Sequence, residues 1–108
     1  MKKLRKFFDR EQNLLIHIIA TIVVITLSII FNLNQLEWIF ILGAIGLVIT
    51  SELINSAIEL TVDIYTSKFH PLAKIAKDTA AAAVVISAFT ALVIGIYIFG
   101  PRILGLIR

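Results

Sequence analysis

The residues best suited to chemistry form a polar stripe within an otherwise apolar stretch of the chain. Glu52, Asn55, Glu59 and Asp63 follow one another at steps of three, four and four residues. At about 100° per residue on an α-helix, these positions stay within roughly 80° of one another. Neighbouring carboxylates repel each other unless a cation or a proton lies between them, and their oxygens suit Mg²⁺. Because Mg²⁺ often takes phosphate oxygens as further ligands, the stripe favours a site for magnesium and a nucleotide.

Glu52 is the member of the stripe that lies deepest in the apolar sequence. We expect Trp38 to lie at the outer membrane interface as an aromatic anchor. Counted from Trp38 along a helix, Glu52 falls at roughly 21 Å and Glu59 at roughly 31 Å, against a bilayer hydrocarbon core of about 30 Å. A carboxylate inside hydrocarbon is costly and must face a partner, a cation or water, so a functional role is the default hypothesis. Glu52 is therefore the best candidate for a general base that accepts a proton from a hydroxyl.

Charged residues from two other segments are expected at the same level. Glu11 sits three residues before the first apolar segment, and Lys74, Lys77 and Asp78 precede the third. On a helix, Lys74, Lys77 and Asp78 share a face and offer cations for phosphate together with another acid. Each has an ordinary interpretation, because lysines at a membrane edge set topology and an Asp before a helix is often its N-cap. Because all of these residues are expected at the same depth as the polar stripe, the functional interpretation is favoured.

Long apolar helices must position these residues. A hydrophobic content of 59% and a mean hydropathy of +1.00 exceed the apolar usage of soluble domains, roughly 45 to 50%. Apolar segments cover residues 14–31, 36–64 and 79–99, and Gly100-Pro101 is expected to end the third helix. The prediction is an all-α, single-domain integral membrane protein over 1–108. Its three-helix bundle has spans at about 14–31, 36–57 and 79–99, and the second helix continues into the cytoplasm to about 64.

The distribution of basic residues predicts the orientation in the membrane. Five of the ten Lys and Arg residues precede the first apolar segment, and the connection over 66–78 carries three more, whereas 32–35 carries none. The N-terminus and the second connection are therefore expected in the cytoplasm, with the C-terminus external, in the cell's inner or plasma membrane. The basic charge is thereby assigned to topology rather than to nucleic acid. The absence of Cys excludes a thiolate nucleophile.

The sequence contains two histidines, which are also candidates for a functional role. His17 lies within the first apolar segment and His70 just before Pro71, and neither has metal-ligand spacing to another His. We expect His17 to make an interhelical hydrogen bond and His70 a loop contact. No Walker-type glycine loop is present in the sequence, so any ATP site would be unconventional.

Two strings of the sequence carry a family resemblance. ELINSAIELTVD from Glu52 to Asp63, followed by FHPLAKIAKD from Phe69 to Asp78, closely resembles the signature of the small prokaryotic diacylglycerol kinase and undecaprenol kinase family. The resemblance runs from about Glu11 to Phe99. The string HPLAKIAKD is more similar to the Gram-positive, undecaprenol kinase branch.

The resemblance implies a homotrimer with shared active sites that phosphorylates a lipid with ATP. Glu52 would be the general base on the lipid hydroxyl. Glu11 and Glu59 would hold a divalent metal, Mg²⁺, on ATP, and Lys77 and Asp78 would engage the nucleotide. The supporting residues would be Asn55, Asp63 and Lys74.

The sequence departs from the family pattern at two places. Only ten residues precede Glu11, whereas family members usually carry an amphipathic surface helix there, and Leu15 stands where the pattern more often has Arg. From these departures we expect an incomplete cradle for lipid or nucleotide and weaker ATP binding.

Undecaprenol is the predicted acceptor, and three other hypotheses remain open. Diacylglycerol could be the acceptor in the same fold. From a different class, the acidic stripe could couple a cation in a small transporter. The chain could also be a degenerate relative that acts only as a membrane assembly partner.

Overall fold

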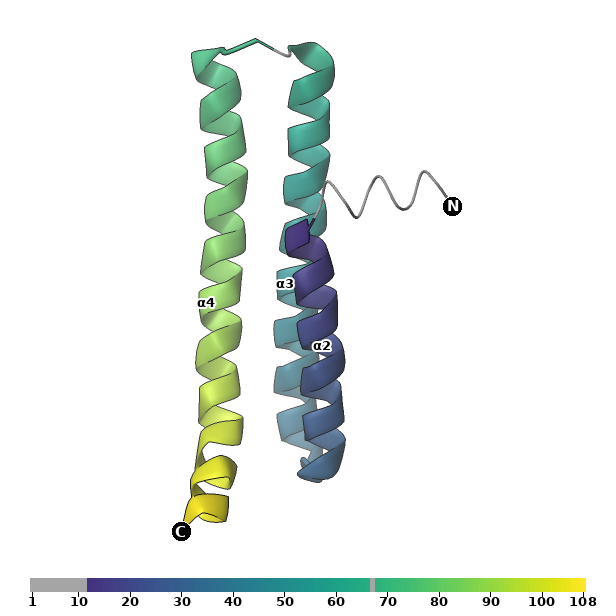
Figure 1. Ribbon diagram of the computed structural model, residues 1–108, viewed down its shortest axis with the longest axis vertical. Coiled ribbons are helices and arrows are strands. Elements are labelled where there is room, and N and C mark those ends of the chain that lie inside the picture. Colours follow the sequence, from purple (N-terminus) through teal and green to yellow (C-terminus); the bar gives the residue numbers. More distant parts are fainter. Residues whose placement is uncertain (1–11, 67) are drawn as a thin grey trace, which may run out of the picture.

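The computed structural model describes residues 12–66 and 68–108, which form three long helices (Figure 1). Helix α2 covers Gln12–Ile30, α3 covers Gln35–Tyr65 and α4 covers Pro71–Ile107. Each is long enough and apolar enough to cross a membrane. The predicted all-α fold with three such helices is confirmed, and α3 runs unbroken through the polar stripe.

The turn between α2 and α3 is set by its own sequence. Asn32 adopts a positive φ of 54°, a conformation that Asn tolerates better than most residues. Asn34 then caps α3: its side-chain oxygen accepts from the Glu37 N–H at 2.9 Å, and its own N–H donates to Glu37 Oε1 at 3.1 Å. This reciprocal capping box satisfies two donors that a helix start would otherwise leave unpaired. Helix α3 therefore begins where the sequence directs it.

Helix α4 is longer than expected at both ends. It begins at Pro71, where the His70 side chain accepts from the Leu72 N–H at 3.1 Å, so Asp78 lies inside the helix and is not its N-cap. The expectation that Gly100-Pro101 end the helix is wrong, because α4 continues through both residues to Ile107. Pro101 removes one backbone donor, a loss that helices in a membrane tolerate when neighbouring groups compensate.

An ion pair between α3 and α4 holds the extension of α4 in place. The Arg102 guanidinium donates to both carboxylate oxygens of Glu37 at 2.6 Å, and also to the Ile98 carbonyl at 2.9 Å. Two parallel hydrogen bonds fix the orientation of both side chains. The contact joins residues 65 positions apart, so it closes the end of the bundle that also holds the α2–α3 turn (Figure 1).

Replacing Arg102 by Gln is expected to lower the melting temperature of the detergent-solubilised protein. The variant loses the bidentate pair and leaves the Glu37 carboxylate without its guanidinium, at the turn of α4 that Pro101 already weakens. Arg108→Gln, at the exposed C-terminus, is the matched control. A melting curve that moves equally for both variants would show that this ion pair does not stabilise the bundle.

Helix α3 is the centre of the packing. It packs against α4 and against α2, whereas the backbones of the described parts of α2 and α4 do not approach each other closely. A small core of Leu33, Ile41, Ile98 and Phe99 lies near the α2–α3 turn, and the rings of Phe31 and Phe99 are 6.1 Å apart. Large apolar side chains such as Ile29 and Phe89, 65% and 67% exposed, cover the outside. Such a surface suits lipid or further helices and not water.

Candidate functional site

The site is built on the half of α3 that leads to the α3–α4 connection. Glu52 is 2% exposed, the most deeply buried acidic side chain among the described residues. Its Oε1 atom lies 3.0 Å from Nε2 of His17 on α2. The distance is within hydrogen-bond range, but the contact does not meet the geometry of a hydrogen bond. His17 therefore contacts Glu52 across the two helices, but the contact does not have the geometry of the interhelical hydrogen bond expected for His17.

Asn55 and Glu59 occupy the next two turns of the stripe. Asn55 Oδ1 is buried and has no hydrogen-bond partner among the described residues, and Glu59 is partly buried. The two residues are four apart on α3 and therefore lie on one face, roughly 6 Å apart along the axis. A buried acceptor without a donor is rare in proteins, and a cation or a hydroxyl group is able to satisfy it.

A magnesium ion would find suitable ligands here. The donors that α3 presents are a carboxylate at Glu59 and an amide oxygen at Asn55, both hard oxygen ligands. Mg²⁺ is commonly held by one or two carboxylates, with phosphate oxygens and water in the other positions. Within the described residues, no group of three or more His, Cys, Asp or Glu could hold a metal on its own. The second predicted metal ligand, Glu11, lies outside the described residues.

Charged residues from α3 and α4 meet at the other end of the stripe. Lys77 Nζ donates to Asp63 Oδ1 at 2.6 Å and joins the two helices, and both side chains are little more than one third exposed. Lys74 Nζ donates to Asp78 Oδ2 at 2.7 Å within α4, where both side chains are about two thirds exposed. The face predicted to be shared by Lys74, Lys77 and Asp78 is present, since all three line one pocket, and Lys77 is the member that contacts α3.

These four charged residues line a polar pocket beside the α3–α4 connection. The pocket also includes residues that sequence reasoning did not select as site residues: Val62, Thr66, Lys68, Phe69, His70 and Ala73. Lys68 and His70 add cationic or hydrogen-bonding groups next to the FHPLAKIAKD string, so their position in or beside that string was the available signal. Three lysines around one pocket suit a phosphate-bearing ligand.

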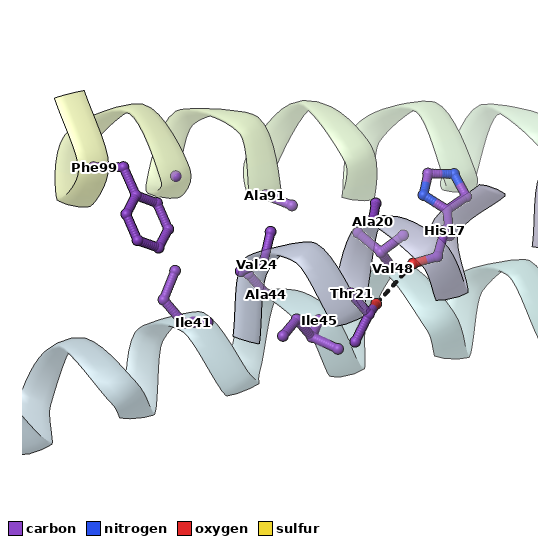
Figure 2. A pocket seen from close by; sticks show the side chains of 11 residues that line it. His17, Ala20, Thr21, Val24, Ile41, Ala44, Ile45, Val48, Ala91 and Phe99 are labelled. Carbon is purple, nitrogen blue, oxygen red and sulfur yellow. Dashed lines mark hydrogen bonds between the residues drawn. The ribbon is translucent and has the colours of Figure 1, made fainter. Parts of the chain in front are cut away.

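An apolar pocket lies between α2, α3 and α4, further from the α3–α4 connection than Glu52. It measures about 150 Å³, and Figure 2 shows His17 at one end and Phe99 at the other. Ala20, Ala44, Ala91 and Gly95 in its wall leave this space because their side chains are small. Leu15, by contrast, is 40% exposed and is not part of the wall.

The arrangement separates two environments along α3. Glu52 belongs to the apolar part of the bundle, whereas Asp63 lies in the polar pocket, roughly 16 Å further along the helix axis. A group entering from the apolar side would meet His17 and Glu52, and a charged group would enter from the connection. This geometry suits transfer of a charged group to an acceptor that is itself apolar.

Comparisons with known proteins point to the same chemistry. The sequence profile of the prokaryotic diacylglycerol kinase family matches residues 1–99. Undecaprenol kinase of Bacillus subtilis is 43% identical over 93 residues, which cover 86% of this chain and 76% of the relative. The diacylglycerol kinase of a Synechocystis species is 35% identical over 100 residues, and that of Helicobacter pylori is 40% identical over 82. The matched regions cover 57% and 64% of those two relatives, less than two thirds of each.

Proposed function

Because this chain belongs to the prokaryotic diacylglycerol kinase family, we propose that it phosphorylates the hydroxyl of undecaprenol with ATP at the cytoplasmic face of the membrane. The family and the enzyme class predicted from the sequence strings, a lipid kinase, are confirmed. Undecaprenol is supported by the name of the relative that is 43% identical. Diacylglycerol is the alternative acceptor, because the relatives at 35% and 40% identity are named diacylglycerol kinases.

The observation that carries this proposal is the position of Glu52 between an apolar and a polar environment. The carboxylate is buried, it contacts His17 at the end of the apolar pocket, and the stripe leads from it to the lysine-lined pocket. A lipid hydroxyl can reach Glu52 from within the bilayer while ATP approaches from water. The proposal does not require a Walker loop, since phosphoryl transfer depends mainly on positioning and charge neutralisation.

In this mechanism Glu52 accepts the proton of the lipid hydroxyl as the oxygen attacks the γ-phosphorus. The bond between the γ-phosphorus and the bridging oxygen breaks, and ADP leaves with the electron pair of that bond. Lys77 and Asp78 engage the nucleotide from α4, and Asp63 orients Lys77 through their 2.6 Å contact. Mg²⁺, held by Glu59 and Glu11 with help from Asn55, would neutralise the charge of the phosphates when bound.

We propose a homotrimer with active sites shared between subunits. The exposed apolar faces of all three helices, and the space left between α2 and α4, support association with further helices. For the orientation, the lysines of the α3–α4 connection support a cytoplasmic location of that end and of the N-terminus. The C-terminus lies at the other end of the bundle and would be external (Figure 1).

Transfer of labelled γ-phosphate in mixed micelles tests the acceptor. The purified protein is expected to phosphorylate undecaprenol with a higher kcat/KM than diacylglycerol, when both lipids are supplied at the same mole fraction. Equal or faster transfer to diacylglycerol would replace undecaprenol by the alternative acceptor. Absence of transfer to either lipid, together with cation flux into proteoliposomes without ATP, would instead identify a transporter.

A further inference from the structure

We propose that His17 is the positioning residue for Glu52, which deepens the proposed function and rests on it. His17 is the one titratable residue in the sequence of α2 from Asn13 to Ile30, and its Nε2 atom lies 3.0 Å from the buried Glu52 carboxylate. An apolar helix that crosses a membrane does not need a histidine to form. A polar side chain within such a helix must find a partner. The partner that the fold supplies is the proposed base.

The backbone and the ring of His17 have different neighbours. The Thr21 hydroxyl donates to the His17 carbonyl at 2.7 Å, within the same turn of α2. The imidazole ring stands at the end of the apolar pocket between α2 and α4 (Figure 2). A rigid ring with two torsion angles is a better anchor than the longer Glu52 side chain, which has three. His17 therefore restricts the carboxylate from the pocket side, while burial restricts it from the rest of the bundle.

A carboxylate that acts as a base must point towards the hydroxyl proton that it removes. An imidazole ring 3.0 Å from Oε1 limits the orientations that the carboxylate can adopt and so directs the lone pairs of Oε2. A hydroxyl that arrives through the apolar pocket passes His17 before it reaches Glu52. Holding a base in reach of the proton that it removes accounts for part of its catalytic effect. His17 acts through Glu52 and is not itself assigned a proton transfer.

Three substitutions of His17 test whether the nitrogen at the Nε2 position is the atom that matters. The side-chain nitrogen of Gln can occupy the position of Nε2, that of Asn corresponds to Nδ1, and Leu offers no donor. His17→Gln is expected to keep kcat within about threefold, whereas His17→Asn and His17→Leu lose about tenfold or more, less than removal of the base itself. The KM for ATP should stay unchanged in all three. Thr26→Val, on an exposed face of α2, is the matched control.

A spectroscopic readout tests the contact without reference to turnover. The chain has two histidines, so ¹⁵N-labelled histidine gives a spectrum in which His70 is an internal control. Glu52→Gln is expected to shift the Nε2 resonance of His17 and leave that of His70 in place. If the wild-type protein phosphorylates no lipid, the proposed function fails, while the shift of His17 still reports whether the pair exists.

Four results would overturn the positioning role. They are equal kcat values for His17→Gln and His17→Asn, an unaltered kcat in His17→Leu, a loss confined to the KM for ATP, and an unshifted His17 resonance in Glu52→Gln. Since His17→Leu could fail to fold, its helicity and elution volume are compared with those of His17→Asn. The polar pair of variants then decides the outcome without the Leu variant.

Discussion

Replacing Glu52 by Gln is expected to abolish transfer of phosphate to the lipid while nucleotide binding is retained. The amide has nearly the same shape as the carboxylate but cannot accept the hydroxyl proton, so kcat should fall by about 10²- to 10⁴-fold, the range for loss of general base catalysis. Because Glu52 is 2% exposed and distant from the polar pocket, its replacement should not disturb the nucleotide. The measurements are lipid phosphorylation and protection of Lys77 by ATP from chemical modification.

Glu37→Gln is the matched control for this prediction, since it makes the same substitution on the same helix at the far end of the bundle. It removes the acid that pairs with Arg102 and lies outside both pockets at the site. Any loss that it causes should follow the fraction of folded protein and not the activity of each folded molecule. Unchanged turnover in Glu52→Gln would remove Glu52 from the role of base.

Replacing Lys77 by Met is expected to raise the KM for ATP by roughly tenfold to a hundredfold, the effect of one charge-assisted hydrogen bond. Lys77 contacts Asp63 at 2.6 Å and lines the polar pocket, so its ammonium is already directed between α3 and α4. Met keeps the apolar stem of the side chain and removes the charge. ATP titrations at saturating lipid provide the measurement.

Lys74→Met provides the comparison for Lys77, because both lysines belong to α4 and line the same pocket. Lys74 pairs with Asp78 on the surface, where exposed ion pairs contribute little, so its effect on the KM for ATP should be clearly smaller. An equal effect of the two variants would show that the pocket attracts ATP by its net charge alone. In that case the contact between Lys77 and Asp63 would have no specific role.

Helix periodicity is enough to predict the polar stripe on α3. The steps of three and four between Glu52, Asn55, Glu59 and Asp63 depend only on the turn of an α-helix, and so does the pairing of Lys74 with Asp78. The existence of three helices follows in the same way from the length of the apolar segments. The two family strings can also be recognised from the sequence, because each is a continuous stretch of the chain.

Contacts between helices cannot be predicted in the same way. Whether His17 faces Glu52, and whether Lys77 or Lys74 faces Asp63, depends on how α2 and α4 are rotated against α3. That rotation results from the packing of many side chains that are far apart in sequence. The end of α4 shows the same limit, since the helix continues through the local stop signal Gly100-Pro101 to Arg102, whose partner Glu37 is 65 residues away.

The sequence by itself predicted that Glu52 lies at membrane depth, and its two strings resemble a family of lipid kinases to which the chain belongs. Only the tertiary structure decided which groups surround that acid: an imidazole on α2, an apolar pocket beyond it, and a lysine-lined pocket at the α3–α4 connection. The physical reason is that depth along a helix is set by residue count, whereas neighbours across helices are set by the packing of the whole bundle.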